Sequence, residues 1–488
     1  MNFQKRINLV LVLCLLSGIS SSVEREVVEA QYCKNSSRNV FSAFDLRGII
    51  LPENEKASLL QAGDEVQLFL NLLLEEDVAK FQKKIDYLRN NWKEPYLPCL
   101  LEILRFRLDH KGQQMIIELL EYITGQDGLD TYYDWVEWIW QQELKPNTLY
   151  VELKAELYAL LDPKFEEYFS SRAEQMRIRL DEVMWGGVLQ DGIPPLRYPS
   201  FVDSDDAKYL DDSNVVFGVV INGQAKAYPK RILAWHEMAV DRFEDTEIAL
   251  VYCTLCGTVI AYDMQHNGVK HVLGTSGFLY RSNKLMYDKA TQSLWNTIEG
   301  KPVIGPLVDR GIELESYPVT TTTWAAWNES YPETKVLSVE TGYRRDYDEG
   351  AAYYKYFSTD ELMFPVPMLS PVLKNKQEVM VVRIEGYAKD PVAFSVDYLK
   401  EKRWHQEEIN GRSVILAVDG LGILRAFDAA DVLFTDVKDQ ALVDTKSREW
   451  EIGKTGLSNG KRLLRQLPSH NIFWFAWYNS YPHTRLIK

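Results

Sequence analysis

Apolar residues recur at helical spacing along the first third of the chain. The segment DEVQLFLNLLLEEDVAKFQKKIDYL has this spacing, and so do LLEILRFRL, QQMIIELLEYI and VELKAELYALL. Residues three and four positions apart share one face of a helix, so each segment presents an apolar face for packing. Proline and glycine residues separate the segments. The pattern therefore predicts an all-α domain of short helices over residues 24–180.

The pattern changes after residue 180. Residues 181–212 are rich in glycine, proline and charged residues, and we expect a linker and entry segment there. Farther on, VVFGVVI and QAKAYP flank Asn222 and Gly223, a pair typical of a two-residue hairpin turn because both residues accept positive φ. A short helix is expected after Pro229, and EIALVYC and GTVIAYD are typical of strands. These signals predict a mainly antiparallel β-rich α+β domain.

Two segments in this second part of the chain match each other. TTTWAAWNESYPETKVL corresponds to NIFWFAWYNSYPHTRLI, which predicts a duplicated domain with copies over residues 213–345 and 346–488. Corresponding positions, first copy then second, are Trp324 and Trp474, Trp327 and Trp477, Cys253 and Val418, Cys256 and Leu421, and Gly257 and Gly422. The predicted class is α+β, with an all-α domain followed by a duplicated domain whose second copy is degenerate. Residues found only in the first copy are candidates for function.

The overall charge limits the partners that the chain can bind. The 70 acidic residues outnumber the 55 Lys and Arg residues, which gives a formal net charge of -15. Phosphate binding depends on clustered Lys and Arg side chains, and no basic patch stands out in the sequence. We therefore expect no nucleic-acid partner. The helical domain is a candidate surface for a protein partner.

The first residues of the chain have the features of a secretory signal. Lys5 and Arg6 precede the apolar run INLVLVLCLLSG, and small residues follow up to residue 22. We expect residues 1–22 to be removed and the mature protein to be periplasmic or secreted. No later segment of the sequence is long and apolar enough to span a bilayer, so we expect no transmembrane segment in the mature chain.

Removal of the signal leaves four cysteines, which fall into two pairs. A disulfide between Cys33 and Cys99 would close a long loop and stabilise the fold by up to about 4 kcal/mol on the chain-entropy model. Pairing Cys253 with Cys256 would contribute only about 2 kcal/mol on the same model. We therefore expect the first pair to be a structural disulfide and the second pair to serve chemistry.

The second cysteine pair has the spacing of a metal-binding or redox site. Cys253 and Cys256 follow a predicted strand and precede Gly257, which can adopt a left-handed conformation. A single Cys-x-x-Cys pair does not complete a four-cysteine zinc site, so other ligands would be needed. His236 is the expected third ligand and Met286 a weaker candidate, a donor set suited to copper or zinc. An ordinary buried position is the alternative for each of them.

A segment that the second copy lacks, GTSGFLYRSNKLMYD, is expected to line a pocket over the two thiols. The candidate catalytic residues are Glu237, Tyr280 and Asp288. The candidate substrate-pocket residues are Ser276, Arg281, Tyr287 and Arg344. The structural alternatives are a tight glycine turn around Ser276, a turn position for Asp288 and a solvated charged loop around Arg344. His266 and His271 are expected to be exposed in a hairpin.

Several of these runs together resemble a known family. AYPKRILAWHE, YCTLCGT, GTSGFLYRSNKLMYDKATQSLW, TTTWAAW and TGYRRDY are similar to a prokaryotic family known as domain of unknown function 3179. The resemblance covers about residue 185 to the end of the chain and implies no particular reaction. Thr254 departs from the proline that we expect in this family. The motif positions are His236, Glu237, Cys253, Cys256, Gly257, Ser276, Gly277, Tyr280, Met286, Tyr287, Asp288, Ser293, Trp295, Arg344 and Asp346.

Three functions remain open at this stage. The first is an exported metalloenzyme, redox or hydrolytic, with a copper or zinc centre formed by Cys253, Cys256 and His236. The second is a thiol-disulfide oxidoreductase that uses the same two cysteines, although a strand follows the pair here and not the helix of the thioredoxin arrangement. The third is a non-enzymatic ligand-binding or scaffold protein.

Overall fold

The computed structural model describes residues 63–170, 173–438, 440–454 and 456–488. The expected signal peptide at residues 1–22 and Cys33 lie outside these residues. By contacts between Cα atoms the chain divides into two units. The first unit ends at Gln190 and also contains residues 291–294 and 302–311, and the second unit comprises the rest of the chain.

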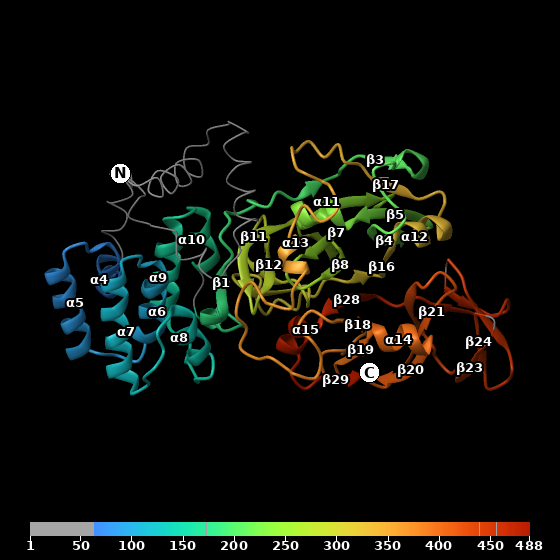
Figure 1. Ribbon diagram of the computed structural model, residues 1–488. Helices are drawn as coiled ribbons and strands as arrows, with labels where there is room; N and C mark the ends of the chain where they lie inside the picture. Colours follow the sequence, from blue (N-terminus) through green and yellow to red (C-terminus); the bar gives the residue numbers. More distant parts are fainter. Residues whose placement is uncertain (1–62, 171–172, 439, 455) are drawn as a thin grey trace. The chain divides into compact units, whose positions relative to one another are not determined.

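The described N-terminal region is helical, as the sequence predicts. Side chains cap several helices in the way that the local sequence favours, since Asp77, Asp109 and Asn147 each accept a hydrogen bond from a backbone N–H three residues on. Figure 1 shows these helices in blue and teal. Within the described residues, none of the helices combines the length and the apolar character that crossing a membrane requires. The helices are α4 (Asp64–Leu74), α5 (Val78–Asn90), α6 (Tyr96–Phe106), α7 (His110–Thr124), α8 (Tyr132–Ile139), α9 (Thr148–Ala159) and α10 (Lys164–Phe169).

The first half of the β-rich unit, up to residue 345, contains two sheets of five strands, ordered β16-β4-β5-β17-β3 and β15-β8-β7-β6-β2. Antiparallel strands β11 and β12 form a further hairpin. The strands are β2 (Leu196–Arg197), β3 (Phe201–Asp203), β4 (Val215–Ile221), β5 (Gln224–Pro229), β6 (Met238–Phe243), β7 (Thr246–Cys253), β8 (Thr258–Asp263), β9 (Gln265–His266), β10 (Val269–Lys270), β11 (Leu273–Tyr280), β12 (Asn283–Asp288), β15 (Ser316–Tyr317), β16 (Val319–Thr323) and β17 (Lys335–Leu337). The helices are α11 (Lys230–His236) and α12 (Trp324–Ser330). Other short strands of the chain are β1 (Val183–Trp185), β13 (Leu294–Asn296) and β14 (Lys301–Ile304).

The second half contains sheets ordered β28-β18-β19-β29, β20-β21-β22 and β23-β24-β25-β26-β27. Its strands are β18 (Glu378–Val382), β19 (Val392–Ser395), β20 (Trp404–Ile409), β21 (Arg412–Val418), β22 (Leu424–Asp428), β23 (Phe434–Lys438), β24 (Ala441–Asp444), β25 (Glu449–Ile452), β26 (Gly456–Ser458), β27 (Leu463–Arg465), β28 (Ser469–Phe473) and β29 (Arg485–Ile487). Its helices are α13 (Tyr354–Phe357), α14 (Val396–Lys402) and α15 (Trp474–Ser480). A helical region followed by β-rich antiparallel and mixed sheets confirms the α+β class.

The expected hairpin at Asn222 and Gly223 is present. Strand β4 ends at Ile221 and β5 begins at Gln224, and the two turn residues have φ angles of 53° and 78°. These positive φ values match the right-handed twist of the paired strands. The short helix α11 begins directly after Pro229, as predicted.

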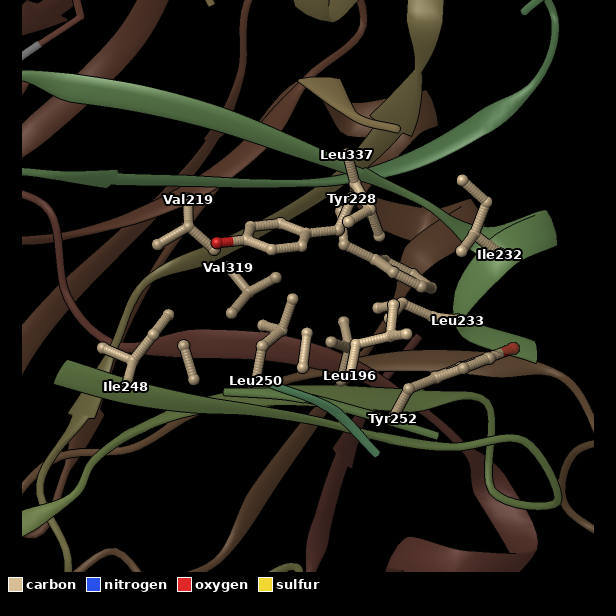
Figure 2. Packing of buried hydrophobic residues seen from close by; sticks show 14 of the residues in the cluster. Leu196, Val219, Tyr228, Ile232, Leu233, Ile248, Leu250, Tyr252, Val319 and Leu337 are labelled. Atoms are coloured by element: carbon tan, nitrogen blue, oxygen red, sulfur yellow. The ribbon is translucent and has the colours of Figure 1, made fainter. Parts of the chain in front are cut away.

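A hydrophobic core lies between the two five-stranded sheets of the first half. Its residues come from β4 and β5 on one side and from β6, β7 and β8 on the other, with α11 beside them. Figure 2 shows this packing, with Val219, Tyr228 and Leu337 from one sheet and Ile248, Leu250 and Tyr252 from the other. The hydroxyl of Tyr252 is directed away from the centre of the cluster. This packing holds strand β7 in place as far as its last residue, Cys253.

Candidate functional site

The two thiols lie in the turn that joins β7 to β8. Cys253 ends β7 and pairs in antiparallel register with Thr258, the first residue of β8. The Cys256 N–H donates to the Cys253 carbonyl at 3.2 Å, and Gly257 has a φ of 61°, which confirms the expected left-handed conformation. The tight turn brings the two Sγ atoms to 2.9 Å. This separation is about 1 Å longer than a disulfide bond.

The turn of the β11–β12 hairpin contacts Cys256. Arg281 and Ser282 form this turn with φ angles of 49° and 61°. The Ser282 carbonyl lies 3.5 Å from Cys256 Sγ, within reach of a thiol hydrogen bond. The Asn283 amide nitrogen donates to the same sulfur at 3.1 Å. Cys256 therefore has both an acceptor for its proton and a donor to its sulfur.

The environment makes the two sulfurs unequal. Burial raises the pKa of Cys253, but the hydrogen bond with Cys256 and the backbone N–H of Lys284 outweigh burial, so the pKa is lowered. Burial and the neighbouring Cys253 sulfur raise the pKa of Cys256 well above its usual range. Cys253 is the better nucleophile of the pair.

A buried ion pair supports the turn. Lys284 Nζ lies 3.5 Å from a Glu237 carboxylate oxygen and donates to the backbone carbonyls of Glu237 at 2.7 Å and Tyr252 at 3.1 Å. The other carboxylate oxygen of Glu237 accepts from the Thr254 hydroxyl at 2.8 Å. Glu237 has a left-handed φ of 54°, which ends α11 and points the chain into β6. This arrangement ties α11, the Cys-x-x-Cys turn and β12 together.

Residues of the second half close the site. The Phe473 N–H donates to the Cys256 carbonyl at 2.8 Å, and the Tyr356 hydroxyl donates to the Leu255 carbonyl at 2.7 Å. As a result Cys253 is 1% exposed and Cys256 is 0% exposed. Large molecules cannot reach either sulfur in this conformation.

Replacement of Gly257 by alanine is expected to destabilise this turn. A Cβ at this position would lie 2.6 Å from carbons of the Phe473 ring, in addition to the strain of φ 61°. The matched control is Gly422→Ala, because Gly422 has φ 80° but no atom within 4 Å of the added Cβ. In both variants we expect backbone strain to lower the free energy of unfolding by about 1–2 kcal/mol. In Gly257→Ala we expect the contact with Phe473 to lower it by about 1–3 kcal/mol more. Equal urea midpoints for the two variants would contradict the close contact.

His236 is fully buried at the end of α11, and hydrogen bonds occupy both of its ring nitrogens. Nδ1 lies 2.8 Å from the Pro194 carbonyl and Nε2 lies 2.6 Å from the Tyr347 hydroxyl. The carbonyl accepts a proton from Nδ1, so Nε2 accepts one from Tyr347. Among the described residues, no group of three His, Cys, Asp or Glu side chains is arranged to hold a metal ion. Both ring nitrogens are therefore engaged in this conformation, and the role of His236 as a metal ligand stays a prediction.

The buried imidazole predicts a loss of stability in acid. Burial lowers the pKa of His236 from 6.5 to about 4. Above pH 6.5 the ring is neutral in both the folded and the unfolded protein. As the pH falls toward 4, only the unfolded protein takes up the proton. The free energy of unfolding therefore falls by up to about 3 kcal/mol. The His236→Gln variant, compared by urea denaturation at several pH values, should lose this part of the pH dependence. An unchanged dependence between pH 6.5 and 4 would contradict the prediction.

The other expected site residues lie farther along the hairpin or on the surface. The Ser276 hydroxyl donates to the Leu285 carbonyl at 2.6 Å, and the Tyr287 hydroxyl donates to Asp191 at 2.7 Å. Met286 is buried in β12 opposite Thr275. Tyr280 ends β11 with the Arg281 guanidinium 5.1 Å from its ring centre, and Arg344 is exposed. Of the expected residues, the structure brings Glu237, Cys253 and Cys256 together, and the roles of the others stay predictions.

The expectation that His271 is exposed is wrong. The imidazole is 5% exposed, lies 5.1 Å from the Trp295 ring and has Nδ1 3.3 Å from an Asp288 carboxylate oxygen. The short β9–β10 hairpin ends before this residue, and the chain then turns inward to begin β11. Cys99 is a fully buried thiol whose Sγ lies 3.5 Å from the Pro95 carbonyl. Its disulfide with Cys33 stays a prediction, since Cys33 lies outside the described residues.

Sequence reasoning did not assign the residues that contact the thiols most closely. Asn283 and Lys284 lie inside the segment that was expected to cover the site, but the sequence does not reveal which of its residues face the sulfurs. Tyr356 and Phe473 belong to the half that lacks cysteines. A signal for the first two was the polar run Ser-Asn-Lys in an otherwise apolar hairpin.

A polar cavity of about 470 Å³ also lies in the second unit. Lys301, Glu313, Lys389 and Arg412 are among its lining residues, and neither thiol lines it. Two of its cations have acidic partners, because Lys301 pairs with Glu313 at 2.9 Å and Arg412 pairs with Asp428 at 2.5 Å. The cavity therefore has less unpaired positive charge than its lining Lys and Arg residues alone would give it.

The fold and the site define an α+β protein with a buried pair of thiols on one half of its β-rich unit. A sequence profile of the family described as "Protein of unknown function (DUF3179)" matches residues 190–484. The match covers more than half of the chain, so the chain belongs to this family. This confirms the resemblance noted from the motifs. No curated protein and no solved structure was found to match the chain.

Proposed function

We propose that this chain is a thiol-disulfide redox protein in which Cys253 and Cys256 cycle between dithiol and disulfide. The observation that carries the proposal is the 2.9 Å separation of the two sulfurs in a turn. A disulfide needs the sulfurs to approach by only about 1 Å more. The unequal pKa values of the two thiols also support it, because exchange begins with a thiolate.

A metal centre is the second candidate. Two thiolates suit copper or zinc, and Cys253 and Cys256 are close enough to share one ion. His236 as the third ligand is less favoured, because Pro194 and Tyr347 already occupy its two nitrogens. The redox proposal needs no further ligand and therefore accounts for more of the geometry.

We also propose that the β-rich unit arose by duplication and that the second half now serves to enclose the thiols. The sheet β16-β4-β5-β17 has the same order as β28-β18-β19-β29, and β6-β7-β8 matches β20-β21-β22. The last two strands run parallel in each of these four-strand groups: β5 and β17 in the first half, and β19 and β29 in the second half. The hydrogen bond from Phe473 to the Cys256 carbonyl supports the enclosing role.

An exported location remains part of the proposal and rests on the sequence of residues 1–22 alone. In an oxidising compartment the pair would form a disulfide readily, so export and a redox role fit each other. A protein partner for the helical region is likewise proposed from sequence. Fractionation of cells that express the full chain, with detection of the processed N-terminus, tests the location.

Metal analysis and thiol counting on the purified full chain discriminate the two candidates. The redox proposal predicts a protein without bound copper or zinc in which mild oxidation removes two thiols and a dithiol reductant restores both. One equivalent of copper or zinc that is lost in the Cys253→Ser variant would instead favour the metal centre. Metal-free thiols that resist reversible oxidation would overturn the redox proposal.

A further inference from the structure

Several buried polar atoms next to the two thiols have no hydrogen-bond partner. They are the hydroxyl oxygens of Thr258 and Ser282 and the side-chain oxygen of Asn283. Such atoms are rare in folded proteins, because each costs about 1–3 kcal/mol when it loses water without gaining a partner. Three of them on residues beside the two cysteines could serve as hydrogen-bonding groups for a small polar molecule.

Each of these atoms belongs to a residue that lies beside one of the two cysteines. Thr258 is the cross-strand partner of Cys253, so the two side chains lie on the same face of the sheet. Asn283 donates to Cys256 Sγ through its nitrogen, which places its unpaired oxygen beside the same sulfur. Ser282 has its carbonyl 3.5 Å from Cys256 Sγ.

We propose that the enclosed dithiol reduces small hydroperoxides, with hydrogen peroxide as the substrate that the site fits. This inference rests on the proposed redox function and names its substrate class. Hydrogen peroxide donates two hydrogen bonds and accepts others, so it can satisfy the hydroxyl and amide oxygens of the residues beside the two cysteines. Both thiols are enclosed, with exposures of 1% and 0%, and this favours a small substrate.

The reaction needs only the two cysteines and the peroxide. The Cys253 sulfur attacks one peroxide oxygen, the O–O bond breaks, and a sulfenic acid and water form. The Cys256 sulfur then attacks the sulfenic sulfur, the S–O bond breaks, and the Cys256 proton leaves with the hydroxide as a second water. The two thiols are oxidised by two electrons in total and one peroxide is reduced to two waters. An external dithiol reduces the resulting disulfide and completes the cycle.

The test compares hydrogen peroxide and diamide on the reduced full chain, with oxidised peptides measured by mass. Hydrogen peroxide should oxidise the Cys253–Cys256 pair at least about 10-fold faster than Cys99, a buried thiol whose pKa is raised well above its usual range. In Cys256→Ser the sulfenic acid on Cys253 should accumulate and react with dimedone. Diamide serves as the second oxidant because it forms disulfides without a peroxide.

Variants that remove a single unpaired hydroxyl test the binding atoms. Thr258→Val, or Ser282→Ala where the first variant does not fold, should slow oxidation by hydrogen peroxide about 3- to 10-fold and leave oxidation by diamide unchanged. The matched control is Ser469→Ala, which removes another buried unpaired hydroxyl at the opposite end of β28 from Phe473. This control should react like the unmodified chain.

The possible failures are distinguishable. A pair that diamide oxidises reversibly but that reacts with hydrogen peroxide no faster than Cys99 overturns the peroxide inference and leaves the redox function standing. A pair that neither reagent converts to a disulfide overturns both. Equal slowing of the diamide and peroxide reactions in Thr258→Val would show an effect on the sulfurs themselves and would contradict peroxide binding at this hydroxyl.

Discussion

Replacement of Cys253 by serine is expected to abolish reversible oxidation of the site completely. In the unmodified chain, mild oxidation should remove two thiols and lower the mass of the peptide that contains both cysteines by two hydrogens. Cys253→Ser leaves Cys256 without a partner sulfur at 2.9 Å, so no disulfide can form within this turn. Thiol counting before and after oxidation, with peptide mass measurement, checks the prediction.

The chain supplies its own control for this experiment. Cys99 is another fully buried thiol, and it lies in the helical region. Cys99→Ser should leave the oxidation of Cys253 and Cys256 unchanged. If Cys253→Ser still loses a thiol reversibly while Cys99→Ser does not, the redox pair has been assigned to the wrong cysteines.

Replacement of Lys284 by methionine is expected to destabilise the β-rich unit by about 3–5 kcal/mol. Lys284 is 5% exposed and its partner Glu237 is 8% exposed, so the variant leaves a buried carboxylate without its cation. It also leaves the backbone carbonyls of Glu237 and Tyr252 without the Nζ donor. Urea denaturation followed by tryptophan fluorescence measures the loss.

Two further variants separate the buried charge from the loss of the side chain itself. Lys301→Met makes the same substitution at an exposed ion pair, whose two side chains are 39% and 49% exposed. This variant should lower the free energy of unfolding by at most about 1 kcal/mol. The double variant Lys284→Met with Glu237→Gln removes the unpaired charge and should recover part of the stability. Similar costs for Lys284→Met and Lys301→Met would mean that the Lys284–Glu237 pair contributes little.

Local signals in the sequence predicted much of the fold. The helical spacing before residue 180, the hairpin at Asn222 and Gly223, the helix after Pro229 and the strand that ends at Cys253 all appear in the structure. Each depends on residues within a few positions of one another, where periodicity and turn preferences are informative. The positive φ of Gly257 was predictable for the same reason.

The surroundings of the thiols depend on distant parts of the chain and were not predictable to the residue. Asn283 reaches Cys256 through the register of the β11–β12 hairpin, whose turn residues, Arg281 and Ser282, lack the glycine or asparagine that usually marks such a turn. Phe473 arrives from the second half of the unit. The ring of His236 contacts Pro194 and Tyr347, and the sequence indicated neither contact; its role as a metal ligand stays a prediction.

An equilibrium redox titration of the full chain tests the central claim most directly. The protein is equilibrated in buffers of varied dithiol-to-disulfide ratio and quenched in acid, free thiols are alkylated, and the peptide that contains Cys253 and Cys256 is weighed. The account predicts one reversible two-electron transition in which both thiols disappear together. Thiols that remain fully reduced in the most oxidising buffer, or that react separately as two mixed disulfides, would contradict it.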